Sequence, residues 1–514
     1  MPAAGAASTV LDARTRAFVT VSVMLATIMQ VLDSTIANVA LPHMEGGLSA
    51  TQDQITWVLT SYIVAAAIGT PLTGWLAGRY GRKRVFLASV VGFTVASIAC
   101  GISTSLVEII GARLLQGLFG AALVPLSQAV MLDINPREKH AQAMAIWGMG
   151  VTIGPILGPA LGGWLTDSYN WRWVFYVNVP IGIIAFLGIL VFMTETKVFT
   201  SKLDLFGFAT LSIAIGALQL FLDRGEVQDW FGSVEIWIES LTALIAFAFF
   251  LAHTLTAGTT SFFNRALALD RNFVTGCGVY FVVGAVLYAT RALLPPLLQN
   301  LMQYSVVDAG LATAPSGAGS MIAMTLAGRL VGPLKARNLI AVGFAIAAFS
   351  LWQMAGYNLY MSESTVIWSG FLQGLGLGLI SVPLTTATFS TLDAQLRGDG
   401  TSIYSLSRNI GSSIGISFVQ TELTRNTQIA HSSLVEHINV YNPLAQADAL
   451  PSLWDLHSAA GLAALNAEVT RQASMIAYVD DFELLFILTL VVIPFLALMR
   501  PAAARPDASS VVEH

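Results

Sequence analysis

An acidic residue, Asp33, lies in an apolar part of the sequence, which reads QVLDSTIANVALP over residues 30–42. The apolar run begins near residue 17, so the carboxylate belongs to a segment long enough to cross a bilayer. A charge at the middle of such a helix costs roughly 3 kcal/mol on insertion scales, and ionisable residues in membrane spans are functional by default. We therefore predict that Asp33 faces a cavity and binds and releases a proton.

Arg113 is a second charge inside an apolar segment, and there it needs a partner. Asp33 is about nine residues and Arg113 about six residues from the outer ends of their helices, which at 1.5 Å per residue places them roughly 5 Å apart in depth. We expect the two side chains to meet. They form either a permanent ion pair or, as we favour, a switch in which protonation of Asp33 releases Arg113 and changes the balance of inward- and outward-facing states.

The composition excludes several classes of protein. The chain has 514 residues, of which 55% are hydrophobic and 11% charged, whereas about a quarter of the residues of a soluble domain are charged. A net charge of -5 does not suggest a nucleic-acid partner. Neither the two cysteines nor the seven histidines have the spacing of a metal site, and no phosphate-binding loop is present. We expect a membrane protein without enzymatic activity, metal or cofactor.

Fourteen apolar segments approach the length of about 20 residues that a membrane-spanning helix requires. They predict an all-α integral membrane fold. The segments cover residues 17–42, 54–78, 84–102, 107–132, 141–165, 173–193, 204–222, 233–252, 273–298, 309–331, 338–357, 365–389, 400–421 and 481–499.

An even number of spans places both ends of the chain on one side of the membrane. Most of the 25 Lys and Arg residues lie on that side, among them Lys197 and Lys202. Because positive residues accumulate in cytoplasmic loops, we expect the amino-terminal segment 1–16 and the tail 500–514 to be cytoplasmic.

Two sequence repeats divide the chain into related halves. LAGR occurs at 76–79 and at 326–329, and LQGLFGAALVPLS at 115–127 is echoed by LQGLGLGLISVPLT at 372–385. Similar matches in the same order at nearly the same offset indicate an internal duplication. They predict six-helix bundles over 17–193 and 273–499 around an inserted pair, 204–252, with the substrate bound between the bundles. The polar segment 422–480 faces outward, either as a solvated loop, which we favour, or as a cap or partner-binding element.

Four glycines recur every fourth residue in the fifth apolar segment, which also contains Pro155 and Pro159. A stripe without side chains lets another helix approach closely, and each proline removes a backbone donor and bends the helix. The pattern predicts either static packing or, as we favour, a kinked helix that can rock. The glycines are Gly150, Gly154, Gly158 and Gly162, with Gly163 following them.

Several motifs resemble the major facilitator superfamily, and specifically its fourteen-span drug:proton antiporters of the EmrB/QacA type. They are GWLAGRYGRKR (74–84), RLLQGLFGAA (113–122), GVTIGPILGPALGG (150–163), LDSTIANVALP in the first span, TWVLTSY (56–62) and LDRGEVQDW (222–230). The resemblance implies a major facilitator fold in a bacterial inner membrane. It also implies proton-coupled export of hydrophobic drugs by alternating access, and hence antibiotic resistance, driven by the proton gradient. The implied partners are a periplasmic adaptor, with 422–480 as the contact, and an outer-membrane channel.

The motif at 74–84 is expected to form a gating loop at the cytoplasmic side. The family uses an aspartate where this chain has Gly78. Asp133, at the end of the fourth span, is therefore a candidate partner for Arg79 or Arg82. The remaining candidates in this loop are Gly74, Gly81 and Lys83.

Candidate residues for the substrate cavity are polar or aromatic side chains within the spans: Gln30, Asn38, Trp57, Tyr62, Arg291 and Arg408. The two arginines have no obvious carboxylate partner, so they either favour anionic amphiphiles or bond to helix-end carbonyls. Besides multidrug efflux, the sequence therefore leaves open the export of endogenous amphipathic acids or lipids, and a non-transporting membrane sensor.

Overall fold

The computed structural model describes residues 12–196, 198, 203–257, 263–331, 334–438, 454 and 458–499. The described residues form helices and no strands. In hydrocarbon every backbone donor and acceptor must be satisfied within the chain, and a helix does this within one segment. Twelve of the described helices are long and apolar enough to cross a membrane. The predicted all-α membrane fold is confirmed.

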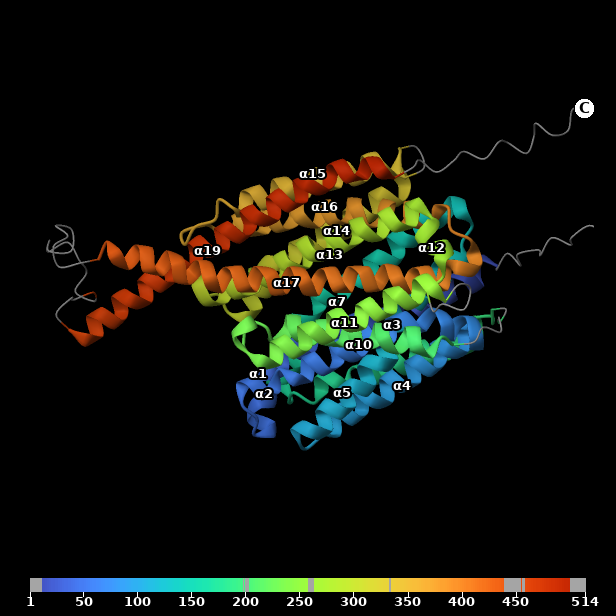
Figure 1. Ribbon diagram of the computed structural model, residues 1–514, viewed down its shortest axis with the longest axis horizontal. Helices are drawn as coiled ribbons and strands as arrows, with labels where there is room; N and C mark the ends of the chain where they lie inside the picture. Colours follow the sequence, from blue (N-terminus) through green and yellow to red (C-terminus); the bar gives the residue numbers. More distant parts are fainter. Residues whose placement is uncertain are drawn as a thin grey trace, which may run out of the picture.

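The amino-terminal half packs at one side of the molecule (Figure 1). A break after α5 divides its fourth span into two helices, and a short helix precedes its last. The helices are α1 (Ala13–Leu48), α2 (Gln52–Ile55), α3 (Trp57–Tyr80), α4 (Arg82–Ile102), α5 (Leu106–Gly120), α6 (Leu123–Ile134), α7 (His140–Ser168), α8 (Trp173–Tyr176) and α9 (Asn178–Phe192).

The carboxy-terminal half repeats this arrangement, and the inserted pair α10 and α11 lies across the seam between the halves (Figure 1). The inserted helices are α10 (Leu205–Arg224) and α11 (Val234–Thr256), followed by the short α12 (Arg265–Leu269). The second half contains α13 (Arg271–Pro296), α14 (Val306–Leu330), α15 (Ala336–Met354), α16 (Glu363–Ser390), α17 (Arg397–Glu436) and α19 (Ala459–Phe495).

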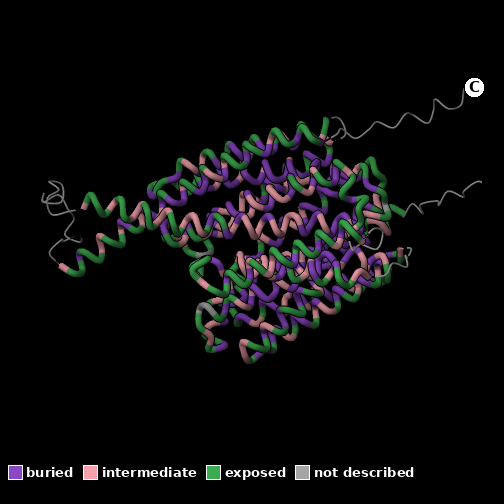
Figure 2. Tube along the Cα trace, viewed as in Figure 1, coloured by how far each residue is buried: buried purple, intermediate pink, exposed green. Residues whose placement is uncertain are grey.

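Two helices of the second half, α14 and α17, are too polar to be counted among the twelve apolar spans. Both run alongside the other helices and pack against elements of both halves (Figure 1). A helix covered by protein needs fewer apolar side chains than one that faces lipid, which accounts for their composition. With them, the described residues contain the fourteen long helices that the sequence predicts. Buried positions concentrate along the inner faces of the bundle (Figure 2).

Equivalent close contacts occur in the two halves. Gly117 of α5 packs against α3 at Tyr62 and Ala65, and Gly374 of α16 packs against α14 at Ser316. Both glycines belong to helices that carry the repeated LQG motif, and α3 and α14 carry the repeated LAGR motif. The repeated motifs therefore occupy corresponding positions in space.

The glycine stripe of α7 faces α1. A Cβ atom at Gly154 would lie 2.7 Å from Cγ1 of Val31, and one at Gly162 would lie 2.8 Å from Cγ1 of Ile36. Thr35 also donates a hydrogen bond to the carbonyl oxygen of Gly154, 3.2 Å away. The helix remains continuous through both prolines. The predicted close packing is therefore present, whereas the rocking motion stays a prediction.

The outward segment 422–480 is not the solvated loop that the sequence favoured. Residues 422–436 continue α17, and residues 459–480 form the first part of α19. The two helices extend beyond the rest of the bundle as a hairpin (Figure 1). The polar residues of this hairpin continue two membrane helices. Hydropathy alone does not distinguish a polar helical extension from a loop. Residues 1–11, 439–453 and 500–514, together with Lys197 and Lys202, lie outside the described residues.

A methyl group at Gly154 tests the contact between α1 and α7. We expect Gly154→Ala to destabilise the protein by about 1–3 kcal/mol, because the new carbon meets the backbone and side chain of Val31. Thermal unfolding of purified protein in detergent measures this loss. Gly163→Ala is the matched control on the same helix, since a Cβ atom there would have no neighbouring atom within 4 Å. Equal melting temperatures for the two variants would contradict the assignment.

Candidate functional site

Asp33 and Arg113 meet in the interior of the amino-terminal half, as the sequence predicts. Arg113 Nη1 donates to Asp33 Oδ2 at 2.6 Å. The other carboxylate oxygen, Oδ1, accepts from Gln116 Nε2 and from Asn178 Nδ2, both at 2.8 Å. The carboxylate thus joins α1 to α5 and α9, and three donors compensate a charge that has no access to water.

The guanidinium of Arg113 is held from several sides. Its Nε donates to the backbone oxygen of Val58 at 3.0 Å, and Nη1 also donates to Gln116 Oε1 at 2.9 Å. Its carbon atom lies 4.2 Å from the ring centre of Tyr62, within the range of a cation–π interaction. Nη2 is buried and has no hydrogen-bond partner among the described residues. Arg113 is therefore fixed to α3 as well as to Asp33.

The pair is completely enclosed: both Asp33 and Arg113 have 0% of their surface exposed. The sequence predicts that Asp33 faces a cavity, and in this conformation it does not. The packing of α1, α4, α5 and α9 covers the carboxylate, with Ser97 bonded to Asn178 behind it at 3.0 Å. Asp33 has no contact with solvent in this arrangement of the helices.

The amino-terminal cavity candidates lie in different surroundings. Gln30 donates to the hydroxyl of Tyr62 at 2.9 Å, which connects both residues to the Arg113 site. Trp57 lies under the guanidinium of Arg224 at 5.3 Å, at the end of the inserted pair. Asn38 is exposed. Gln30 and Tyr62 therefore belong to the buried network, and Trp57 and Asn38 do not.

Three charges connect the two halves at the basic end of the bundle, which we define as the end where Arg79, Arg82 and Arg397 lie. Asp133 of α6 forms an ion pair with Arg82 of α4. It also accepts from Arg397 Nη1 of α17 at 3.0 Å, and the same nitrogen donates to the backbone oxygen of Leu132 at 3.3 Å. Asp133 thus links its own half to the other half.

The loop at 74–84, for which the sequence predicts a gating role, is bonded to Glu195, a residue outside the predicted site. Glu195 accepts from the backbone nitrogen atoms of Lys83 at 3.0 Å and Arg84 at 3.2 Å. Gly81, at φ +91°, packs against the same carboxylate. Arg79 is exposed and has no ion pair among the residues that the structure describes. Of the two arginines predicted for Asp133, the structure selects Arg82.

Gly74 has a separate reason to be a glycine. A Cβ atom there would lie 2.7 Å from the Cα atom of Asp399, the second residue after Arg397 at the start of α17. The close approach brings α3 and α17 together beside the charges on Asp133. Gly74 therefore permits contact between the halves at the basic end.

Arg291 and Arg408 come together around one aromatic ring in the carboxy-terminal half. Both guanidinium carbons lie 5.9 Å from the ring centre of Tyr288, and Arg408 also lies 5.8 Å from that of Tyr280. Arg408 bonds to Asn409 at 3.1 Å. Neither arginine forms an ion pair with a described residue. This part of the protein has uncompensated positive charge.

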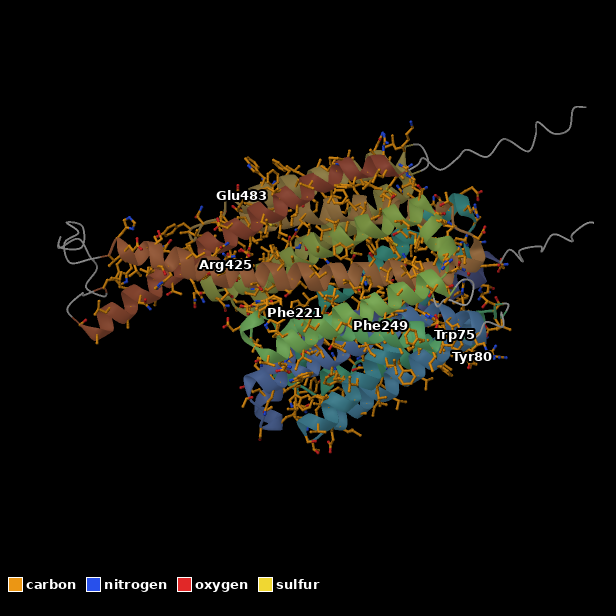
Figure 3. All side chains as sticks on the ribbon, in the orientation of Figure 1. Trp75, Tyr80, Phe221, Phe249, Arg425 and Glu483 are labelled. Carbon is orange, nitrogen blue, oxygen red and sulfur yellow. The ribbon has the colours of Figure 1, made fainter. Side chains whose placement is uncertain are left out.

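A cavity of about 550 Å³ lies between α10 and α11 on one side and α3 and α17 on the other. Its wall is apolar except at a few positions, of which Asp399 carries a charge. Phe221 and Trp75, both in the wall, lie toward opposite ends of the bundle (Figure 3). None of the six cavity candidates lies in this wall, because the predicted binding region lies between the two six-helix bundles and excludes the inserted pair.

Five residues of the site were missed from the sequence: Gln116, Asn178, Ser97, Glu195 and Arg397. The sequence could have indicated Asn178 as a site residue, because its side-chain amide lies within an apolar stretch, where such a group needs a hydrogen-bond partner. Arg397 resembled an ordinary loop charge, and its pairing with Asp133 depends on contact between helices 264 residues apart in the chain. No pattern in the sequence indicates that contact.

The chain is similar to known transporters along most of its length. The family model described as Major Facilitator Superfamily matches residues 23–416. The multidrug export protein EmrB of Escherichia coli (strain K12) is 40% identical over 431 residues, which cover 83% of this chain and 84% of that protein. The fatty acid resistance protein FarB of Neisseria gonorrhoeae is 36% identical over 488 residues, covering 94% and 96%.

A solved structure has a similar fold. The crystal structure of the human organic anion transporter MFSD10 (TETRAN) superimposes with a TM-score of 0.59, covering 92% of this chain and 99% of that chain. The sequence identity is 16%, so this likeness concerns the fold alone.

The ion pairs of Asp133 predict that its charge favours contact between the halves at the basic end. We expect Asp133→Asn to shift the equilibrium toward separated halves by about 1 kcal/mol, a several-fold change, because the pairs are only partly buried. Distance distributions between spin labels at Lys139 and Lys335 measure this shift. Arg79→Gln removes an unpaired charge from the same end and should leave the distances unchanged. Identical distributions for wild type and Asp133→Asn would refute the link.

Proposed function

The chain belongs to the major facilitator superfamily, and from this premise we propose that it is a proton-coupled multidrug exporter of hydrophobic and amphipathic compounds. It works by alternating access between its two halves. The similarity to the multidrug export protein EmrB over most of both chains supports the substrate class. The proposed location is a bacterial inner membrane with the basic end in the cytoplasm.

The single observation that carries the proton coupling is the enclosed network around Asp33. One carboxylate receives hydrogen bonds from Arg113, Gln116 and Asn178. A proton on Asp33 removes the charge that attracts Arg113, so the network connecting α1, α5 and α9 loses its strongest interaction. The two protonation states therefore favour different helix arrangements, which is the requirement for a switch.

The energies involved are of comparable size. Breaking a buried ion pair by removing one partner costs about 3–5 kcal/mol. A proton that moves down a membrane potential contributes about 2.3 kcal/mol per 100 mV, and a pH gradient adds to this. One proton bound at Asp33 thus supplies a free energy on the scale of the interaction that it alters.

The conformation fits one stage of this cycle. The ion pairs of Asp133 with Arg82 and Arg397 hold the halves together at the basic end. With the basic end in the cytoplasm, this is a state closed to the cytoplasm. The glycine-lined contact of α7 with α1, and of α7 with α14 at Gly328, places α7 at the interface that must rearrange.

The apolar cavity beside the inserted pair suits the proposed substrates. Its size and its lining match the sites that bind drug-sized apolar molecules. The long hairpin of α17 and α19 extends from the end opposite the basic end, where we infer contact with a periplasmic adaptor and, through it, an outer-membrane channel. The proposed transport needs no cofactor and is driven by the proton gradient.

Asp33→Asn tests the coupling. The amide keeps the shape of the protonated carboxyl group but binds no proton, so we expect loss of substrate-induced proton release and at least a tenfold loss of gradient-driven transport in proteoliposomes. Asp167→Asn is the matched control, because Asp167 is an exposed aspartate on α7. If Asp33→Asn still concentrates substrate against a gradient, the proposed coupling is refuted.

A second candidate function, the export of amphipathic acids, is favoured by Arg291 and Arg408. The two arginines share the ring of Tyr288 and have no described carboxylate partner, so an anionic head group is their natural complement. The similarity to the fatty acid resistance protein FarB, over nearly the whole of both chains, supports this candidate.

Charge removal at the two arginines separates the candidates. If acids are the substrates, Arg408→Gln and Arg291→Gln should each raise the KM for a fatty acid about tenfold, a loss of roughly 1.4 kcal/mol. Transport of a cationic drug should not decrease. Arg425→Gln, at an exposed site on α17, is the matched control. An equal effect on acid and cation transport would remove the acid-export candidate.

A further inference from the structure

A buried carboxylate that the proposed cycle does not use, Asp481, lies on α19. Only 1% of its surface is exposed. Neither Oδ1 nor Oδ2 has a hydrogen-bond partner among the described residues. This contrasts with Asp33, whose two oxygens receive three hydrogen bonds. The site around Asp481 therefore lacks the donors that a buried anion requires.

The charges near Asp481 are acidic. Glu422 of α17 and Asp480 of α19 are the charged groups that act on Asp481. Tyr478 of α19 is also close enough for its hydroxyl to interact with the charge of Asp481. The two arginines of this region have other partners. Arg425 forms an ion pair with Glu422 at 3.9 Å, and Arg471 forms one with Glu468 at 3.3 Å. No described cation is bonded to Asp481.

The other elements that pack against this part of α19 present apolar groups. Residues of α13, α15 and the turn at Leu297–Leu301 form one cluster with the neighbours of Asp481. A titratable group on that side, Tyr357, packs edge-on against Phe482 and bonds to Ser369. The cluster contains Val286, Leu293, Leu297, Leu301, Leu351, Met354, Tyr478, Phe482 and Leu485.

A carboxylate in such surroundings is stable only in its neutral form. An ionised group without partners is strongly disfavoured in an apolar interior, and a nearby like charge disfavours it further. A metal ion does not resolve the conflict, because the described residues contain no group of three or more His, Cys, Asp and Glu side chains that could hold one.

We propose that Asp481 is a second proton-binding site, which holds a proton while α17 and α19 are packed together and releases it when they separate. Release leaves Asp481 and Glu422 with like charges on facing helices, so their repulsion keeps the helices apart. Glu483 and Arg425, on either side of this region, lie where the two helices leave the bundle to form the hairpin (Figure 3). The site thus lies at the root of the hairpin, away from the basic end.

This site is independent of Asp33 in position, since it belongs to the other half. Its role in transport rests on the proposed proton-coupled export: it makes the cycle respond to the pH of the compartment that the hairpin enters. Its protonation does not rest on that function. A titration of the purified protein without substrate therefore tests the site separately.

The test is the number of protons released when purified protein in detergent is moved from roughly pH 6 to roughly pH 9, a range above the ordinary aspartate pKa of about 3.9. We expect Asp481→Asn to release one proton fewer than wild type. Asp480→Asn, at an exposed aspartate one residue away, is the control for the number of protons: it should release as many as wild type, at a lower pH, because it also removes a negative charge that acts on Asp481. The same loss is expected in the Asp33→Asn background.

Glu422→Gln provides a second test that keeps the carboxyl group of Asp481. Removing the neighbouring negative charge weakens proton binding, so the release should move toward lower pH without a change in the number of protons. Infrared difference spectra should contain a protonated-carboxyl band that disappears in Asp481→Asn and persists in Asp480→Asn. Equal proton release by wild type and Asp481→Asn, or no shift in Glu422→Gln, would overturn the proposal even if transport proves to be proton-coupled.

Discussion

The free-energy cost of burying charged side chains away from water determines how the helices around Asp33 pack. In the amino-terminal half the charge of Asp33 is balanced by Arg113 and two amide donors, and no part of the ion pair is exposed. Such a network persists only with every member in place, because each unpartnered group would be left in a low-dielectric interior. The helices α1, α3, α5 and α9 pack together around the Asp33–Arg113 pair, and each contributes a bonding partner to the pair or covers it from water.

The same constraint distinguishes the two halves. The first half compensates its buried carboxylate, whereas in the second half the described residues offer no donor to Asp481 and no carboxylate to Arg291 and Arg408. Binding of a proton or of a ligand of opposite charge lowers the free energy of a buried charged group most where that group has no partner in the protein. The two halves have similar folds but differ in their buried charges. The first half pairs its buried carboxylate with its own side chains, whereas Asp481, Arg291 and Arg408 of the second half have no oppositely charged partner among the described residues.

Contact between the halves uses small residues and charges in separate places. Gly328 of α14, against α7, and Gly74 of α3, against α17, let backbones of opposite halves approach, and Asp133 joins Arg82 and Arg397 at the basic end. Small residues let the helix backbones approach closely, while the partly exposed ion pairs at one end contribute little energy each. The inserted pair covers the seam from the side and forms one wall of the apolar cavity.

The sequence by itself determined the membrane class, the helices, the duplicated halves and the pairing of Asp33 with Arg113. Hydropathy is read from single segments and the duplication from repeated motifs, and the two intramembrane charges Asp33 and Arg113 lie at nearly the same depth. Only the tertiary structure decided that Asn178 completes this network, that Arg397 joins Asp133, that the segment after residue 421 continues as helix, and that Asp481 has no donor among the described residues. These features depend on which helix faces meet across long stretches of chain, and that choice is made by the packing of the whole bundle.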